Sequence, residues 1–156
     1  MMPSAQPVVI TVTANTGLDL VYFIPSFEQG KTLRARQIVQ TISGKPIDCS
    51  WILMEMGVPS LALGFTAGQT GEIFKQMVRE RGIESDFITT EGETRRNLVI
   101  ATDDGKPHTA ITSSTMIVTD AHVAALREKF IAALDHCELV VLGGTLPTGM
   151  KPEYYT

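Results

Sequence analysis

Short apolar runs alternate with helix signals along this chain. The β-branched run Val8–Thr13 is typical of a buried first strand, and the continuous run Leu139–Leu142 is typical of a central parallel strand. Strands that alternate with helices predict a three-layer α/β fold with a parallel, Rossmann-like sheet. The capping residues and apolar stripes predict helices over residues 47–56, from Thr70 to just before Gly82, and from Thr119 or Asp120 onward.

One excursion interrupts this alternation. Residues 18–25 and 32–42 are predicted to be extended, and residues 95–112 contain two further strands joined by a turn at Asp103–Lys106. The first of these segments carries large apolar side chains on both faces, so it needs cover on both. We therefore expect a small β-strand lid whose outer face meets a second subunit. Residues 1–156 are expected to form one such domain.

Composition excludes several classes of function. The chain has 156 residues, of which 44% are hydrophobic, and a net charge of −4. We therefore expect no nucleic acid and no membrane as partner. Cys49 and Cys137 lie far apart and form no CxxC pair, which favours a reducing, cytoplasmic compartment. The three histidines lack the spacing of metal ligands, so we expect no metal site in this sequence.

Polar and glycine-rich segments stand where ligands bind in open α/β sheets, beyond the carboxyl ends of the strands. Asn15 and Asp19 follow the first strand, and a carboxylate accepts hydrogen bonds from sugar hydroxyls. On local sequence alone, a turn residue after Gly17 explains Asp19 more simply. Gly44 and Lys45 precede a helix in which Pro46 is the predicted first residue, with Lys45 as its cap. They offer backbone N–H groups and an ammonium to an anion, although a glycine turn with a solvated lysine is an equal alternative.

Two arginines precede an alternating strand. Arg95 and Arg96 should point to opposite faces, so one of them can reach the site, while a surface role for both is the alternative. A carboxylate, a lysine at a helix start and an arginine are the groups that hold a phosphorylated polyol. The sequence contains neither GxGxxG nor GxxxxGK[ST], which excludes the dinucleotide fingerprint and the P-loop.

The order of these segments resembles the pfkB-type sugar kinases of the ribokinase superfamily, and within them the branch of 1-phosphofructokinases and tagatose-6-phosphate kinases. The resemblance spans essentially the whole chain, and the ordered set of motifs is far more specific than any single one. The matching segments are Thr13–Asp19 (TLNPALD-like), Ser43–Asp48 (GGKGxN in part), Leu63–Gly71 (LGxxGxTG), Gly82–Phe87 (GIxxDF), Glu93–Asn97 (ETRxN) and Gly143–Gly149 (SGSLPxG).

This resemblance implies an ATP-dependent kinase for a sugar or sugar phosphate, with Mg²⁺ in the intact protein and lid strands that pair in a homodimer. It implies that Asp19 binds sugar hydroxyls, and that Arg95 and Asn97 hold the phosphate already on the substrate. The substrate-binding residues that the chain itself or the resemblance suggests are Asn15, Asp19, Gly44, Lys45, Asp48, Arg95 and Asn97.

Two positions depart from the family pattern. Asp48 stands where the family has asparagine, which places an acceptor-only carboxylate near an anionic ligand. Pro46 replaces a glycine and removes one N–H group. The family's nucleotide site, its GAGD-type anion hole and its catalytic base belong to a second half. We therefore expect an amino-terminal piece, truncated before its C-terminal half, with no catalytic residue and inactive alone.

Three other functions stay open. Pro46 and Asp48 favour a non-catalytic relative that binds sugar phosphates. A related kinase for a nucleoside or a non-phosphorylated sugar is the second alternative, because the acceptor is not fixed by these motifs. The third is a flavodoxin-like binding domain, which leaves the extra lid segment after the first strand unexplained.

Overall fold

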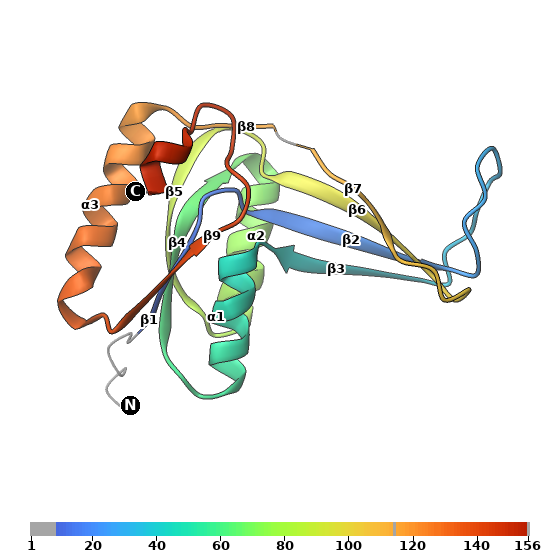
Figure 1. Cartoon of the computed structure of the whole chain (residues 1–156), viewed down its shortest axis with the longest axis horizontal. Coiled ribbons are helices and arrows are strands. Elements are labelled where there is room, and N and C mark those ends of the chain that lie inside the picture. Colours follow the sequence, from blue (N-terminus) through green and yellow to red (C-terminus); the bar gives the residue numbers. More distant parts are fainter. Residues whose placement is uncertain (1–8, 114, 156) are drawn as a thin grey trace.

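A computed structural model describes residues 9–113 and 115–155 and contains two sheets, one five-stranded and one four-stranded (Figure 1). The five-stranded sheet has the order β8-β5-β4-β1-β9, and its four longer strands run parallel to one another. The predicted α/β fold with a parallel sheet is confirmed; Val8, its first predicted strand residue, lies outside the described residues. The strands are β1 (Val9–Thr13), β4 (Ser60–Ala67), β5 (Glu84–Gly92), β8 (Met116–Ile117) and β9 (Leu139–Gly143).

Helices cover both faces of this sheet, which makes three layers (Figure 1). Alternate residues of β4 face opposite ways: Phe65 packs in a cluster with Leu126 of α3, whereas Ala62 packs with Phe74 of α2. A buried hydrogen bond of 2.7 Å between Thr11 and Ser50 ties α1 to β1. No helix in the described part of the chain is long and apolar enough to cross a membrane. The helices are α1 (Lys45–Glu55), α2 (Gly68–Glu80) and α3 (Asp120–Ala133), with short 3₁₀ helices at Leu134–His136 and Pro152–Tyr155.

The second sheet projects away from the three-layer body as an arm (Figure 1). It has the order β3-β2-β6-β7, and β2 pairs with β6 in parallel and with β3 antiparallel. Its root is anchored, because Leu18 and Ile42 are buried against α2. That the sheet acts as a lid stays a prediction. Its strands are β2 (Gly17–Ile24), β3 (Gln37–Ser43), β6 (Arg95–Thr102) and β7 (Thr109–Ile111).

The ends of some elements differ from the prediction. The extended segment predicted over residues 32–42 is a strand only from Gln37 onward. Thr70 was predicted to cap α2, but the helix begins at Gly68. The cap comes from a distant segment instead: the Glu93 carboxylate accepts a hydrogen bond from the Thr70 backbone N–H. Hydrogen bonding with the Thr70 side chain, and then with the Thr70 backbone N–H, lowers the pKa of Glu93, because both donors favour the ionised carboxylate.

The prediction that Leu139–Leu142 is a central strand is wrong for the described residues. β9 pairs only with β1 and therefore forms one edge of the sheet. Leu139 and Leu142 are 57% and 47% exposed. A run that is apolar on both faces marks a strand, but its place in the sheet depends on pairing that the run itself does not encode.

Candidate functional site

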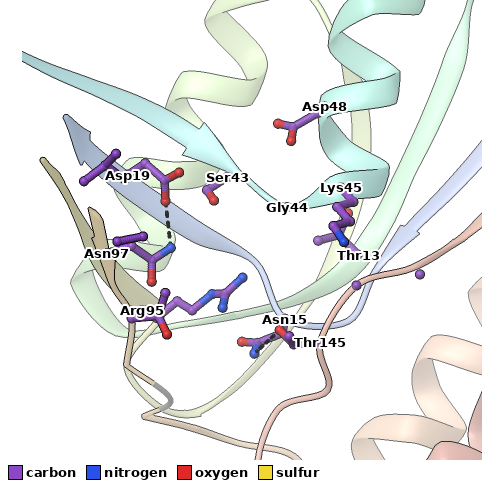
Figure 2. A pocket seen from close by; sticks show the side chains of 15 residues that line it. Thr13, Asn15, Asp19, Ser43, Gly44, Lys45, Asp48, Arg95, Asn97 and Thr145 are labelled. Atoms are coloured by element: carbon purple, nitrogen blue, oxygen red, sulfur yellow. Dashed lines mark hydrogen bonds between the residues drawn. The ribbon is translucent and has the colours of Figure 1, made fainter. Parts of the chain in front are cut away.

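A cavity of about 450 Å³ opens where the three-layer body meets the second sheet (Figure 2). It lies beyond the carboxyl ends of β1 and β9, at the start of α1, and beneath one face of β2 and β6. The structure brings all seven candidate residues together around it, although their part in binding stays a prediction. They are Asn15, Asp19, Gly44, Lys45, Asp48, Arg95 and Asn97.

Asn15 lies on the cavity rim because parallel strands end at the same edge of a sheet. β1 and β9 are paired in register from Val9 to Thr13, so the loops that follow them are neighbours. The Asn15 side-chain amide donates a hydrogen bond of 3.1 Å to the Thr145 hydroxyl in the loop after β9. This bond joins two segments that are far apart in sequence and closes one side of the cavity (Figure 2).

Asp19 and Asn97 lie side by side on the second sheet and present side-chain oxygen atoms as hydrogen-bond acceptors. They are register partners on β2 and β6 and therefore share the face that lines the cavity. The Asn97 Nδ2 group donates a 2.7 Å hydrogen bond to Asp19 Oδ1, which orients the carboxylate. Asn97 is only 5% exposed, and its Oδ1 atom has no partner within the described residues. Free acceptors in this position suit the hydroxyl groups of a ligand.

The start of α1 presents its backbone to the cavity. Gly44, which has no side chain to act as a cap, is the N-cap of this helix, rather than the predicted Lys45. Gly44 has φ of 142°, and a Cβ atom here would lie 2.5 Å from the Thr13 Cγ2 atom. Glycine is therefore required both by the backbone conformation and by the close approach of β1. The exposed Lys45 ammonium adds positive charge at this helix N-terminus, although Pro46 lacks an N–H group.

Arg95 reaches into the cavity, and its neighbour Arg96 points the other way. Figure 2 shows the Arg95 side chain among the residues that line the cavity. It passes over Gly17, where a Cβ atom would lie 2.9 Å from Arg95 Cγ. Burial lowers the pKa of the Arg95 guanidinium, and the Asp19 carboxylate opposes that shift. Arg96 Nε instead donates to the Thr70 hydroxyl at 3.0 Å. The predicted opposite orientation of the two arginines is confirmed.

Arg95 also has a buried donor that is not used by the protein. Its Nε atom has no hydrogen-bond partner in the part of the chain that the structure describes. The Thr13 hydroxyl, which lines the same cavity, is also buried and has no hydrogen-bond partner among the described residues. Buried polar groups are nearly always satisfied, so these atoms mark places where a ligand or water completes the bonding.

Asp48 faces the cavity from the first turn of α1, opposite Asp19 (Figure 2). The residue is exposed, yet the surrounding protein raises the pKa of its carboxyl group to about 6. Partial desolvation is the larger cause, and repulsion from the Asp19 carboxylate adds to it. Among the described residues that line the cavity, the charged groups are thus two carboxylates, Asp19 and Asp48, and two cations, Lys45 and Arg95.

Several residues that line the cavity were not among the candidates. Ser43 and the loop Gly143–Gly149 belong to segments that match the family motifs, so the sequence did point to them. Val99 of β6 and Ala110 of β7 had no signal, because only the pairing register brings them to this face. The additional lining residues are Thr13, Ser43, Val99, Ala110, Thr112, Gly143, Gly144 and Thr145.

Residues 9–156 match the family described as pfkB family carbohydrate kinase. The chain belongs to the pfkB family. This confirms the resemblance seen in the ordered motifs.

Relatives and solved structures agree with this assignment. The pfkB chain is 32% identical over 147 residues to the 1-phosphofructokinase of Bacillus subtilis (strain 168), covering 94% of this chain and 47% of that protein. The crystal structure of a possible 1-phosphofructokinase from Thermotoga maritima superposes with a TM-score of 0.87 at 34% identity, over 92% of this chain and 46% of the other. The chain thus spans about half the length of these relatives.

A more distant likeness bears on the fold alone. The phosphofructokinase-2 of Escherichia coli, solved in complex with fructose-6-phosphate, has a TM-score of 0.86 at 20% identity. This match covers 94% of the pfkB chain and 48% of the other chain. The arm-like second sheet and the three-layer body are therefore a fold shared with phosphofructokinases.

Proposed function

We propose that this chain supplies the sugar site and lid of an ATP-dependent kinase whose substrate is a sugar phosphate, as in 1-phosphofructokinases. The observation that carries the proposal is that one cavity contains both acceptors for hydroxyl groups and cations for a phosphate. Hydroxyl acceptors, Asp19 and Asn97, lie beside the cation Arg95, with the Lys45 ammonium and the start of α1 opposite. A phosphorylated polyol needs both kinds of group within its own length.

Each part of the ligand has a place in this arrangement. The sugar hydroxyls would donate to the Asp19 carboxylate and to the free Asn97 Oδ1 atom. The phosphate would accept from the Arg95 guanidinium, whose buried Nε atom has no partner in the described residues, and from the second N–H of the Asn97 amide. Asn15, Gly44 and the remaining lining residues would shape the cavity around the sugar.

ATP as phosphoryl donor is part of the same proposal and is supported by membership of the family. Mg²⁺ stays a prediction. Across residues 9–113 and 115–155, no three His, Cys, Asp or Glu side chains gather as they would around a metal ion. The cytoplasmic location likewise stays a prediction, which Cys49 and Cys137 support because they are free thiols.

We also propose that the second sheet pairs with the same sheet of a second copy. Tyr22, Ile38 and Ile100 are register partners on the face opposite the cavity, and they line a hollow of about 550 Å³. Ile38 is 55% exposed, and Ile111 on β7 is 58% exposed. An arm that is apolar on its outer face suits an isologous contact, in which both copies bury the same patch.

A non-catalytic relative that binds sugar phosphates is the second candidate function. The observation that favours it is the Asp48 carboxylate, which faces the cavity where the family pattern has an amide. Turnover of a sugar phosphate by the protein that contains this chain, with consumption of ATP, would exclude this candidate.

Calorimetric titration tests the proposed ligand class. The probes are fructose 1-phosphate, fructose 6-phosphate, fructose and inorganic phosphate, each added to the 156-residue chain at pH 6.5. We expect at least one ketohexose phosphate to bind about tenfold or more tightly than both fructose and inorganic phosphate, because it engages the two kinds of group together. Equal, weak affinity for all four probes would contradict the proposal.

A further inference from the structure

The Asp48 carboxylate is the charged group of the cavity that the proposed function leaves unexplained. It lies on α1 across the cavity from Asp19, and the structure gives it no hydrogen bond or ion pair among the described residues (Figure 2). It lines a cavity that a ligand would fill. A bound sugar phosphate would therefore remove water from Asp48 at the same time as it adds negative charge nearby.

The other charged groups of the cavity do not offset the repulsion between an ionised Asp48 and a bound phosphate. Asp19 on β2 repels Asp48, and Arg95 on β6 is already opposite Asp19. Lys45 lies on the same helix as Asp48, one turn before it. β3, β7 and the loop after β9 contribute only uncharged residues to the described cavity lining. With both carboxylates ionised, the two cations are fully balanced before any phosphate enters.

We propose that Asp48 takes up one proton from solvent when the cavity binds a phosphorylated sugar, so that its carboxyl group donates a hydrogen bond to the ligand. The inference rests on the proposed function, because it takes a sugar phosphate as the ligand. A buffer acid or hydronium ion supplies the proton, which forms an O–H bond on the carboxylate, and no other bond changes. The protonated acid then offers the donor that an asparagine amide would offer at the same position.

The expected size of the proton uptake follows from the protonation of Asp48 in the free chain. In the free chain, the pKa of Asp48 is about 6, so about a tenth of the molecules carry the proton at pH 7. Binding should then take up about 0.9 proton per site at pH 7. Since affinity falls as the proton becomes scarce, the same linkage predicts a Kd up to about 50-fold higher at pH 8 than at pH 6.

Calorimetry in buffers of different ionisation enthalpy measures this proton uptake directly. The chain is titrated with fructose 6-phosphate or fructose 1-phosphate, whichever binds more tightly, at pH 6, 7 and 8. The Asp48→Asn variant should show no uptake at pH 7. The phosphate group itself titrates near pH 6, but this affects both proteins equally. The ratio of wild-type to Asp48→Asn Kd should therefore rise by up to about 50-fold from pH 6 to pH 8.

Asp135→Asn is the matched control. It makes the same change of charge at an exposed residue of the 3₁₀ helix before β9, at the end of the sheet opposite the cavity, and should behave as wild type. Equal uptake by wild type and Asp48→Asn, with binding intact, would overturn the inference and leave the proposed function standing. No binding of either sugar phosphate by wild type or variant would overturn both. Should Asp48→Asn fail to fold, an uptake below about 0.2 proton by the wild type still overturns the inference.

Discussion

Replacing Arg95 with alanine should weaken the binding of a phosphorylated sugar by between about 10- and 150-fold. A hydrogen bond to a charged group contributes about 1.5–3 kcal/mol, and each 1.4 kcal/mol is about a tenfold change in affinity. The loss should be selective, because Arg95 faces the phosphate rather than the hydroxyl acceptors in the proposed arrangement. Affinity for unphosphorylated fructose should change by less than about threefold. Parallel calorimetric titrations of the two ligands give both numbers.

Arg96→Ala is the matched control for this experiment. Arg96 is the next residue on the same strand, and its side chain bonds to Thr70 outside the cavity. It should leave the affinity for the sugar phosphate within about twofold of wild type, with thermal unfolding used to check the fold. Equal losses for fructose and its phosphate in Arg95→Ala would remove the phosphate role of this residue and favour a kinase for a plain sugar.

Replacing Ile38 with glutamate should convert a dimeric chain into a monomer and raise the dimer dissociation constant by more than about 100-fold. Ile38 lies on the edge strand β3, beside Tyr22, on the apolar outer face that the two form with Ile100. An isologous contact would place this ionised carboxylate in the interface twice, and each copy must be desolvated without a partner. Sedimentation velocity over a range of protein concentrations measures the change.

Val39→Glu separates this effect from a general effect of added charge. Val39 is the next residue on β3 and points to the opposite face, because side chains alternate along a strand. The Val39→Glu variant should sediment as the wild type does. A wild-type chain that is monomeric at all concentrations, or two variants that dissociate equally, would contradict pairing through the outer face.

The parts of the fold that are set by local sequence were predictable. The β-branched run before Asn15 gave β1 to within a residue or two, and Pro46 with the preceding glycine marked the start of α1. The segments that line the cavity were also predictable. Glycine and polar residues mark the ends of strands, where the backbone turns and ligands bind, and these residues can be seen in the sequence.

The remaining features depend on contacts between distant segments. The cap of α2 comes from Glu93, which is 23 residues from Thr70, whereas the local sequence pattern indicated Thr70 itself as the cap. The Asn97–Asp19 hydrogen bond spans 78 residues and follows from the register of β2 with β6. The same register decides that Val99 lines the cavity. The pattern of apolar and polar residues within one strand does not specify which strand pairs with it. For that reason the sequence did not predict that β9 lies at the edge of the sheet.

The most direct measurement is the mapping of a bound sugar phosphate onto the chain by ¹H–¹⁵N chemical-shift perturbation. Fructose 6-phosphate, or fructose 1-phosphate if that binds more tightly, is titrated into the labelled protein. The largest shifts should fall on Asp19, Gly44, Lys45, Arg95 and Asn97, with Arg96→Ala leaving this pattern unchanged and Arg95→Ala reducing it. Shifts confined to the apolar hollow between α3 and β9, around Val123, Leu142 and Met150, would contradict a sugar-phosphate site in the cavity.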